Sequence, residues 1–115
     1  MTQKFRVQFL QDAADFLDSI DSKAREKIIY NIFKAQLTND KELFKKLTNE
    51  IWEFRTLYNK TYYRLFAFWD KSESTGTIVI STHGLIKKTD KTPPADLARA
   101  EKLRRLYLDQ KLNKK

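Results

Sequence analysis

Three consecutive segments after residue 50 show the two-residue hydrophobic period of β-strands, and short links join them. They cover residues 50–58, 61–70 and 77–86, with the polar pair Asn59-Lys60 as a tight turn that lacks the favoured glycine. Links this short cannot form crossovers, so neighbouring strands must run antiparallel. The middle segment, TYYRLFAFWD, is apolar or aromatic on both faces, as central strands usually are. The pattern predicts an antiparallel meander with residues 61–70 at its centre.

The residues before this meander predict one further strand and two helices. Phe5, Val7 and Phe9 alternate with polar residues, which indicates a strand with one buried face. Helical spacing follows, with capping residues at Asp12 and Ser22. Because the link between the two helices is only two or three residues long, they should form an antiparallel hairpin. The apolar stripe of the second helix consists of Ile28, Ile29, Ile32, Phe33 and Leu37.

Two shorter signals complete the predicted fold. A turn of helix is expected from Asp40 to Leu47, and Thr92 before Pro93 is typical of the start of a final helix. The elements together predict an α+β fold, a single domain over residues 1–115. It should have a small, mainly antiparallel sheet, an N-terminal helical hairpin on one face and a C-terminal helix. We expect the helices to leave the other face of the sheet available for a site.

The positive charge is concentrated in the last third of the chain. The net charge is +8, and residues 83–115 contain ten basic and four acidic side chains. Such a bias indicates a polyanionic partner, either nucleic acid, an anionic membrane surface or an acidic protein. The alternative is a surface that only keeps the protein in solution.

Several classes of protein are excluded by what the sequence lacks. There is no Cys, hence no disulfide, thiolate nucleophile or Cys-based zinc site, and the single His rules out paired-histidine metal sites. Two glycines leave no phosphate-binding loop or dinucleotide fingerprint. No apolar run approaches the roughly 20 residues that cross a bilayer, and the start lacks the apolar region of a signal peptide. We expect a cytoplasmic protein without metal, cofactor or membrane association.

Cations beside aromatic side chains form the candidate site. Arg64 lies in the middle of the aromatic strand, where a charge is costly to bury alone. It either pairs with Glu53 on the adjoining strand or faces a groove that receives an anion, and Arg55 lies on the same predicted face. Lysines that follow the last strand would project beside this groove, or lie in a solvated loop: Lys87, Lys88 and Lys91.

His83 is the only side chain whose unperturbed pKa lies near neutrality, which makes it a candidate for proton transfer. The alternative is a hydrogen-bonded structural histidine beside Gly84. Tyr62 is a candidate for stacking on a base, and an ordinary packing role is the alternative.

The segments IWEFR, YYRLF and THGLIKKTDKTPPADLARA resemble the pattern of RelE/HigB toxins, members of the RelE/ParE superfamily. In that pattern an E-L-R strand and a Y-R-x-x-Y/F strand precede h-G-F-x-K-K-T-x-K-T-P and a final helix. The K-K-T-x-K-T-P string is the most specific part. This chain departs from the pattern at Phe54, where Leu is commoner, and at Leu85, where an aromatic residue is commoner.

This resemblance implies a function. Toxins of this type are endoribonucleases that cleave mRNA in the ribosomal A site, and an antitoxin, usually with a helix-turn-helix domain, inhibits them. It further implies that Arg55 and Arg64 contact the scissile phosphate, and that Lys87 and Lys88 hold the RNA backbone or assist proton transfer. Tyr62, His83 and Lys91 are then the predicted RNA-binding residues. Because RNA carries its own 2′-OH nucleophile, such a site requires neither metal nor cofactor.

Two other functions remain open. A ParE-like toxin shares the fold and poisons DNA gyrase by binding it, and a non-catalytic RNA-binding module would use the same basic surface without chemistry. The basic groove favours the nuclease over the gyrase poison.

Overall fold

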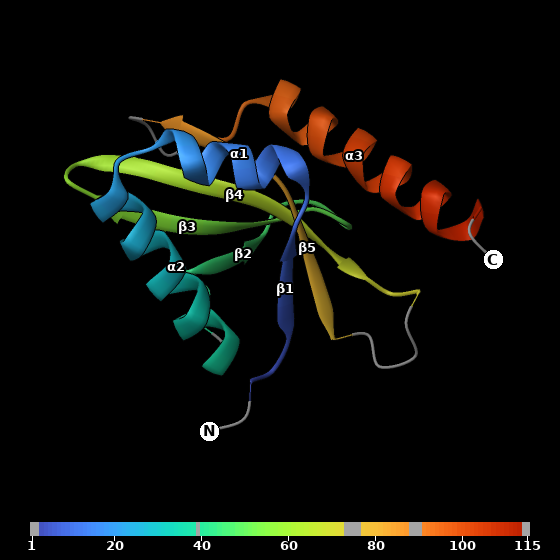
Figure 1. The fold of residues 1–115 in the computed structure, drawn as a ribbon, viewed down its shortest axis with the longest axis horizontal. Coiled ribbons are helices and arrows are strands. Elements are labelled where there is room, and N and C mark those ends of the chain that lie inside the picture. Colours follow the sequence, from blue (N-terminus) through green and yellow to red (C-terminus); the bar gives the residue numbers. More distant parts are fainter. Residues whose placement is uncertain (1–2, 39, 73–76, 88–90, 114–115) are drawn as a thin grey trace.

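The computed structural model describes residues 3–38, 40–72, 77–87 and 91–113. The chain forms a five-stranded sheet and three helices (Figure 1). In chain order the elements are β1 (Arg6–Phe9), α1 (Gln11–Ser19), α2 (Ser22–Leu37), β2 (Phe44–Lys46), β3 (Trp52–Tyr58), β4 (Thr61–Asp70), β5 (Ile78–Lys87) and α3 (Pro94–Asn113). The predicted α+β class is confirmed.

The strand order across the sheet is β1-β5-β4-β3-β2. Strands β2 to β5 pair antiparallel, so the predicted meander with β4 at its centre is confirmed. The β3–β4 turn is the polar pair Asn59-Lys60, and both residues adopt positive φ, 52° and 62°. Positive φ at two central residues is typical of a turn whose twist matches a hairpin. Strand β1 pairs parallel with β5, which makes the sheet mixed.

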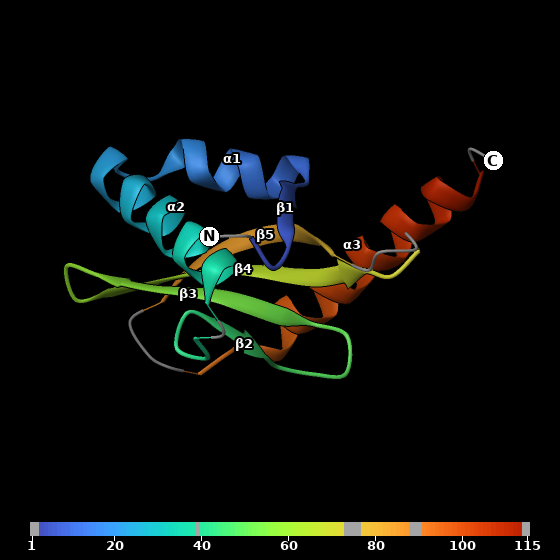
Figure 2. The same cartoon turned by 90° about the horizontal axis from the view of Figure 1, so that it is seen from below.

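The helical hairpin covers one face of the sheet (Figure 2). Both helices begin slightly before the positions predicted: α1 at Gln11 without a side-chain cap, and α2 after Asp21. Asp21, rather than Ser22, caps α2, because its carboxylate accepts hydrogen bonds from the backbone N–H groups of Lys23 and Ala24. The core beneath the hairpin includes Phe5, Ala13, Leu17, Ile28, Ile32, Phe54 and Leu65.

The predicted apolar stripe of α2 is rotated relative to the buried one. Ile28 and Ile32 are buried, but Ile29 and Phe33 are exposed. The sheet side of the helix is filled instead by small or polar residues, Ala24, Asn31 and Ala35. Asn31 reaches the sheet through a hydrogen bond of 3.1 Å from its amide to the hydroxyl of Thr56.

The predicted helical turn from Asp40 to Leu47 is wrong, because this segment contains strand β2. Phe44 lies opposite Phe54 in the register of β2 and β3, and their rings stack with centroids 4.3 Å apart. Cross-strand aromatic packing of this kind overrides a weak local preference for helix.

Helix α3 packs on the second face of the sheet, opposite the hairpin (Figure 2). The face that was expected to stay available is therefore only partly open. Its second, smaller core consists of Ile51, Phe66, Phe68, Ile78, Ile80 and Ala100. The last turns of α3 are held by the fully buried Asp70, which accepts hydrogen bonds of 2.7 Å from the hydroxyl of Tyr107 and from Nζ of Lys111. Within the described ranges, no helix combines the length and the apolar character required to span a membrane.

Candidate functional site

The strand register gathers four of the predicted site residues on the second face of the sheet. Arg55 on β3 lies opposite Arg64 on β4, and Tyr62 on β4 lies opposite Lys87 on β5. Residues directly opposite each other in neighbouring strands project to the same side. We call this group, Arg55, Tyr62, Arg64 and Lys87, the cationic face.

Arg64 is the buried member of the cationic face, with 1% of its surface exposed. Its Nη1 donates hydrogen bonds to both carboxylate oxygens of Glu53, at 2.9 and 3.3 Å, and to the hydroxyl of Thr92 at 2.9 Å. Its guanidinium also lies 5.9 Å from the ring centroid of Tyr62. Of the two arrangements considered from the sequence, the structure shows the cross-strand pair with Glu53. The contact of Arg64 with a phosphate stays a prediction.

Glu53 is as deeply buried as its partner. Burial raises the pKa of Glu53 above its usual value, and the positive charges of Arg64, Arg55 and Lys45 offset this only in part. The cationic face thus contains a buried ion pair whose desolvation is costly. Through Arg64 the pair contacts both Tyr62 and Thr92.

Arg55 and Tyr62 are half-buried and border solvent. They line a surface hollow of about 550 Å³ at the edge of β3, together with Asn31, Glu42, Leu43 and Leu57. Arg55 also borders a second hollow beside Trp52, whose cations were not predicted as site residues: Lys41, Lys45 and Lys46. The sequence did not predict these lysines as site residues because residues 40–47 were interpreted as a helical turn. In the structure β2 places Lys45 opposite Glu53, and so on the side of the cationic face.

Of the three predicted lysines, the structure describes Lys87 and Lys91. Lys87 ends β5, partly exposed. Lys91 is exposed and directly precedes Thr92, whose hydroxyl accepts from Arg64. Lys88 lies outside the described residues.

His83 is buried as fully as Arg64. Its Nε2 lies 3.1 Å from the Asp96 carboxylate in the first turn of α3, and its Nδ1 lies 3.1 Å from the hydroxyl of Thr82. The imidazole stacks on Phe66 with ring centroids 4.7 Å apart. Burial lowers the pKa of His83, although Asp96 acts in the opposite direction. These contacts fit the structural histidine considered as the alternative, and RNA binding by His83 stays a prediction.

A β-bulge lies at His83, where β4 and β5 lose their regular pairing. The register of β4 and β5 shifts between Leu65 and Ala67, so that Thr82 and His83 share the space opposite Phe66. The carbonyl of Phe66 accepts hydrogen bonds from the hydroxyls of Ser81 and Thr82 at this irregularity. His83 therefore lies on the same face of the sheet as Phe66, where its imidazole meets Asp96 at the start of α3.

The chemistry of this face suits a polyanion. Guanidinium groups donate paired hydrogen bonds to phosphate oxygens, lysines add charge, and a tyrosine ring offers a surface for a base. Among the residues that the structure describes, no group of three His, Cys, Asp or Glu side chains could hold a metal ion.

Comparisons with known proteins agree with this fold. A family model described as phage-derived protein Gp49-like matches residues 15–105. The toxin–antitoxin complex RelBE2 from Mycobacterium tuberculosis is similar with a TM-score of 0.57 and 16% identity, over 73% of this chain and 99% of that one. A mutant of the E. coli toxin RelE in the free state gives a TM-score of 0.61 and 12% identity, over 86% and 96% of the two chains. The archaeal RelE–RelB complex from Pyrococcus horikoshii gives 0.51 and 12%, over 76% and 99%. Curated protein sequences contain no match to this chain.

Proposed function

Because the chain belongs to the Gp49-like family and has the fold of RelE toxins, we propose that it is the toxin of a toxin–antitoxin module. Its activity is the cleavage of mRNA in the ribosomal A site, without a metal ion, in the cytoplasm where ribosomes work. Its partners are the ribosome-bound mRNA and a cognate antitoxin with a helix-turn-helix domain. The observation that carries this proposal is the cationic face, which the strand register assembles on the open part of the second sheet face.

The accessible residues of this face have distinct roles in the proposed reaction. Arg55 donates hydrogen bonds to the oxygens of the scissile phosphate, where negative charge grows as the reaction proceeds. Lys87, with Lys88 and Lys91 after it, holds the neighbouring backbone phosphates. Tyr62 stacks on a base beside the scissile bond. Arg64, tied to Glu53 and Thr92, acts as a positioning residue that orders Tyr62 and the start of the last segment.

The RNA supplies the nucleophile. The 2′-oxygen attacks phosphorus, the bond from phosphorus to the 5′-oxygen breaks, and the products are a 2′,3′-cyclic phosphate and a 5′-hydroxyl. The 2′-OH loses its proton and the departing 5′-oxygen gains one, so no oxidant or other reactant is consumed. The protein aligns the attack and stabilises charge, which removes the need for a strong general base.

The test is single-turnover cleavage of mRNA on programmed ribosomes. Arg55→Ala should lower the cleavage rate about 10²–10³-fold, because one preorganised charge-stabilising donor is lost. Arg105→Ala removes a well-exposed arginine from α3 and is the matched control, which should cleave at the wild-type rate. Absence of cleavage by the wild-type protein would refute the nuclease, and equal rates for both variants would refute the role of Arg55.

The burial of Arg64 and His83 favours one other candidate, a ParE-like toxin that binds DNA gyrase without chemistry. A gyrase supercoiling assay with the same proteins separates the two. Inhibition of supercoiling without ribosomal cleavage would replace the nuclease by the gyrase poison. RNA binding with neither activity would leave a non-catalytic RNA-binding module.

A further inference from the structure

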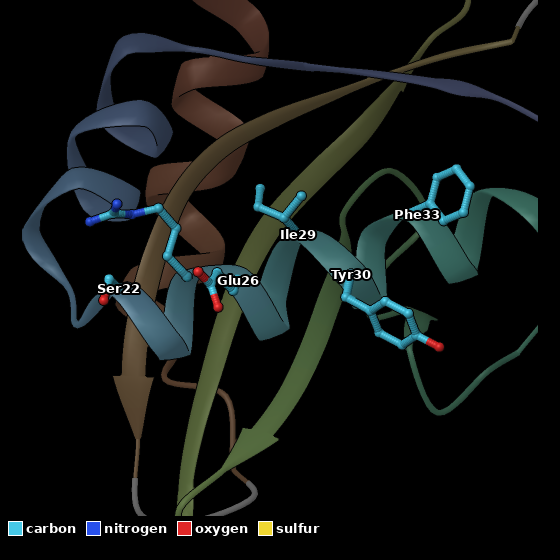
Figure 3. A pocket seen from close by; sticks show the side chains of 6 residues that line it. Ser22, Glu26, Ile29, Tyr30 and Phe33 are labelled. Atoms are coloured by element: carbon cyan, nitrogen blue, oxygen red, sulfur yellow. The ribbon is translucent and has the colours of Figure 1, made fainter.

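The outer side of α2 carries a row of large apolar side chains that the rest of the chain does not cover. Ile29, Tyr30 and Phe33 are 44%, 57% and 50% exposed. Figure 3 shows them along one side of α2, with Ser22 and Glu26 extending the row toward the start of the helix. Together with Arg25 these residues line a hollow of about 500 Å³. Adjacent apolar side chains left open to water in a small protein mark an interaction site.

The hollow is held by the hairpin itself. Nε of Arg25 donates a hydrogen bond of 2.7 Å to the carbonyl of Leu17, and its Nη2 donates one of 3.3 Å to the carbonyl of Ile20. These two carbonyls end α1, so Arg25 locks the two helices together at one end of the row. A preformed surface costs less ordering on binding than a flexible one.

The shape and charge of the row indicate its occupant. The row extends from Ser22 to Phe33 along the outer side of α2, about three turns, a length that matches the apolar face of another helix laid alongside. Helix α2 has four basic side chains, Lys23, Arg25, Lys27 and Lys34, against the single acidic Glu26. Lys27 lies beside the row, with Nζ 5.4 Å from the ring centroid of Tyr30. A partner helix with carboxylates beside its apolar face would complement this surface.

A second copy of this chain fits the row poorly. Two α2 helices face to face would bring their lysines together. Helix α1 of another copy is acidic, with Asp12, Asp15 and Asp18 and no basic residue, but none of its large apolar side chains is exposed. Within the hairpin, α2 thus offers only the apolar face and α1 only the complementary charge.

We propose that Ile29, Tyr30 and Phe33 form the docking surface for an acidic amphipathic helix of a separate protein. This surface lies on the hairpin side of the sheet, whereas the cationic face lies on the other side (Figure 2). The partner therefore anchors without covering Arg55 or Lys87. That the partner is the antitoxin rests on the proposed function, whereas the docking surface itself does not.

The probe is a phage-displayed library of amphipathic helices with a fixed apolar row and randomised flanking positions, selected on the full chain. Asp and Glu should be enriched at the flanks. Synthetic copies of the selected peptides should lose at least about tenfold in affinity for Ile29→Ser and for Phe33→Ser, because each removes an apolar anchor at the centre of the interface. Salt should weaken binding, since the flanking charges are exposed. Binding is measured by fluorescence anisotropy.

The matched controls are Leu106→Ser and Leu112→Ser on α3, since these leucines are 48% and 64% exposed and lie outside the row. Their affinity for the peptides should equal that of the wild type. Melting curves establish that all four variants fold, and Lys27→Glu, which leaves the apolar row intact, should on its own weaken the acidic peptides. Enrichment of neutral or basic flanks, or binding that survives Phe33→Ser, would overturn the proposal.

Two further measurements identify which claim fails. A dimer in sedimentation experiments that Phe33→Ser dissociates would assign the row to a second copy and overturn the proposal. Peptide-saturated protein should bind RNA as the free protein does, and competition between peptide and RNA would show that the docking surface reaches the cationic face. If the wild-type protein binds the peptides but does not cleave mRNA on ribosomes, the proposed nuclease is refuted and the docking surface stands.

Discussion

At the scale of single residues, the Arg64–Glu53 pair dominates the second face of the sheet. Both side chains are buried, and the ion pair links the two central strands β3 and β4. Removing one partner of such a pair leaves an uncompensated charge, whereas replacing both by apolar groups leaves none. The geometry shows the structural role of the pair, whereas the contact of Arg64 with a phosphate stays a prediction, and mutagenesis can separate the two.

We expect Arg64→Ala to lower the free energy of unfolding by about 3–5 kcal/mol, because Glu53 is stranded in the sheet. The double variant Glu53→Leu with Arg64→Met should regain most of this stability. Urea unfolding measures both, with Arg105→Ala as a control that changes little because Arg105 is exposed. If the double variant regains stability but not ribosomal cleavage, the ion pair is required for the reaction beyond its contribution to stability. Wild-type stability of Arg64→Ala would contradict the role of the pair.

A glycine is required at position 84, in the segment THGLIKKTDKTPPADLARA, for a purely steric reason. Gly84 on β5 faces α1, and a Cβ at this position would overlap the ring of Phe16. The hairpin can approach the sheet this closely only where the strand has no side chain. The glycine that precedes Leu85 is thus a requirement of packing.

At the scale of elements, α3 depends on one buried carboxylate. Burial by itself raises the pKa of Asp70, but hydrogen bonds from Lys111, Ser72 and Tyr107 outweigh it and lower the pKa from 3.8 to about 2. A carboxyl whose pKa is lower in the folded than in the unfolded protein stabilises the fold above its unfolded pKa. That contribution is lost as the pH falls from about 3.8 through about 2.

We expect Asp70→Asn to lower the free energy of unfolding by roughly 2 kcal/mol at pH 7, and by progressively less between pH 4 and pH 2. The difference between wild type and variant isolates Asp70 from the other buried groups, Glu53 and His83. Asp109→Asn removes an exposed carboxylate from the same helix and should give no such difference. Urea unfolding across this pH range is the measurement, and a difference that does not change with pH would contradict the assigned role of Asp70.

At the scale of the whole molecule, the sheet separates two surfaces of different chemistry. The second face carries Arg55, Tyr62 and Lys87, proposed to contact phosphates and bases, and the hairpin side carries the apolar row of α2, proposed to bind a protein. A bound partner and a bound RNA can therefore occupy the chain together. With the proposed nuclease activity and the proposed docking surface together, we expect the partner to prevent cleavage by blocking entry to the ribosome rather than by filling the site.

We expect RNA affinity to depend on salt through the cationic face alone. If Lys87 contacts one phosphate, Lys87→Gln should reduce the log–log salt slope by roughly 0.7–0.9 and weaken binding to all sequences about equally. Lys34→Gln removes an exposed charge on the opposite side and is the matched control, with an unchanged slope. Equal effects of the two substitutions would show that only net charge matters, and would contradict a defined RNA-binding face.

The sequence by itself determined the α+β class, the antiparallel meander and the central position of β4. These follow from hydrophobic period and link length, which are local and need no partner. It also placed Arg55, Tyr62 and Arg64 on strands whose register could bring them together, whereas Lys87, expected after the last strand, ends β5. Strand β2 was misread because its apolar residues gain their stability from cross-strand stacking on Phe54, which a local pattern does not contain.

Only the tertiary structure decided which of these residues can meet a ligand. The position of α3 over the second face, and the contact of Thr92 with Arg64, bury a cation that the strand pattern alone leaves open. Helix α3 covers His83, whose imidazole contacts Asp96 in the first turn of that helix. The rotation of α2, set by Ala24 and Ala35 against the sheet, leaves Ile29 and Phe33 exposed. Burial depends on which surfaces meet across the whole chain, so residue spacing within one segment cannot determine it.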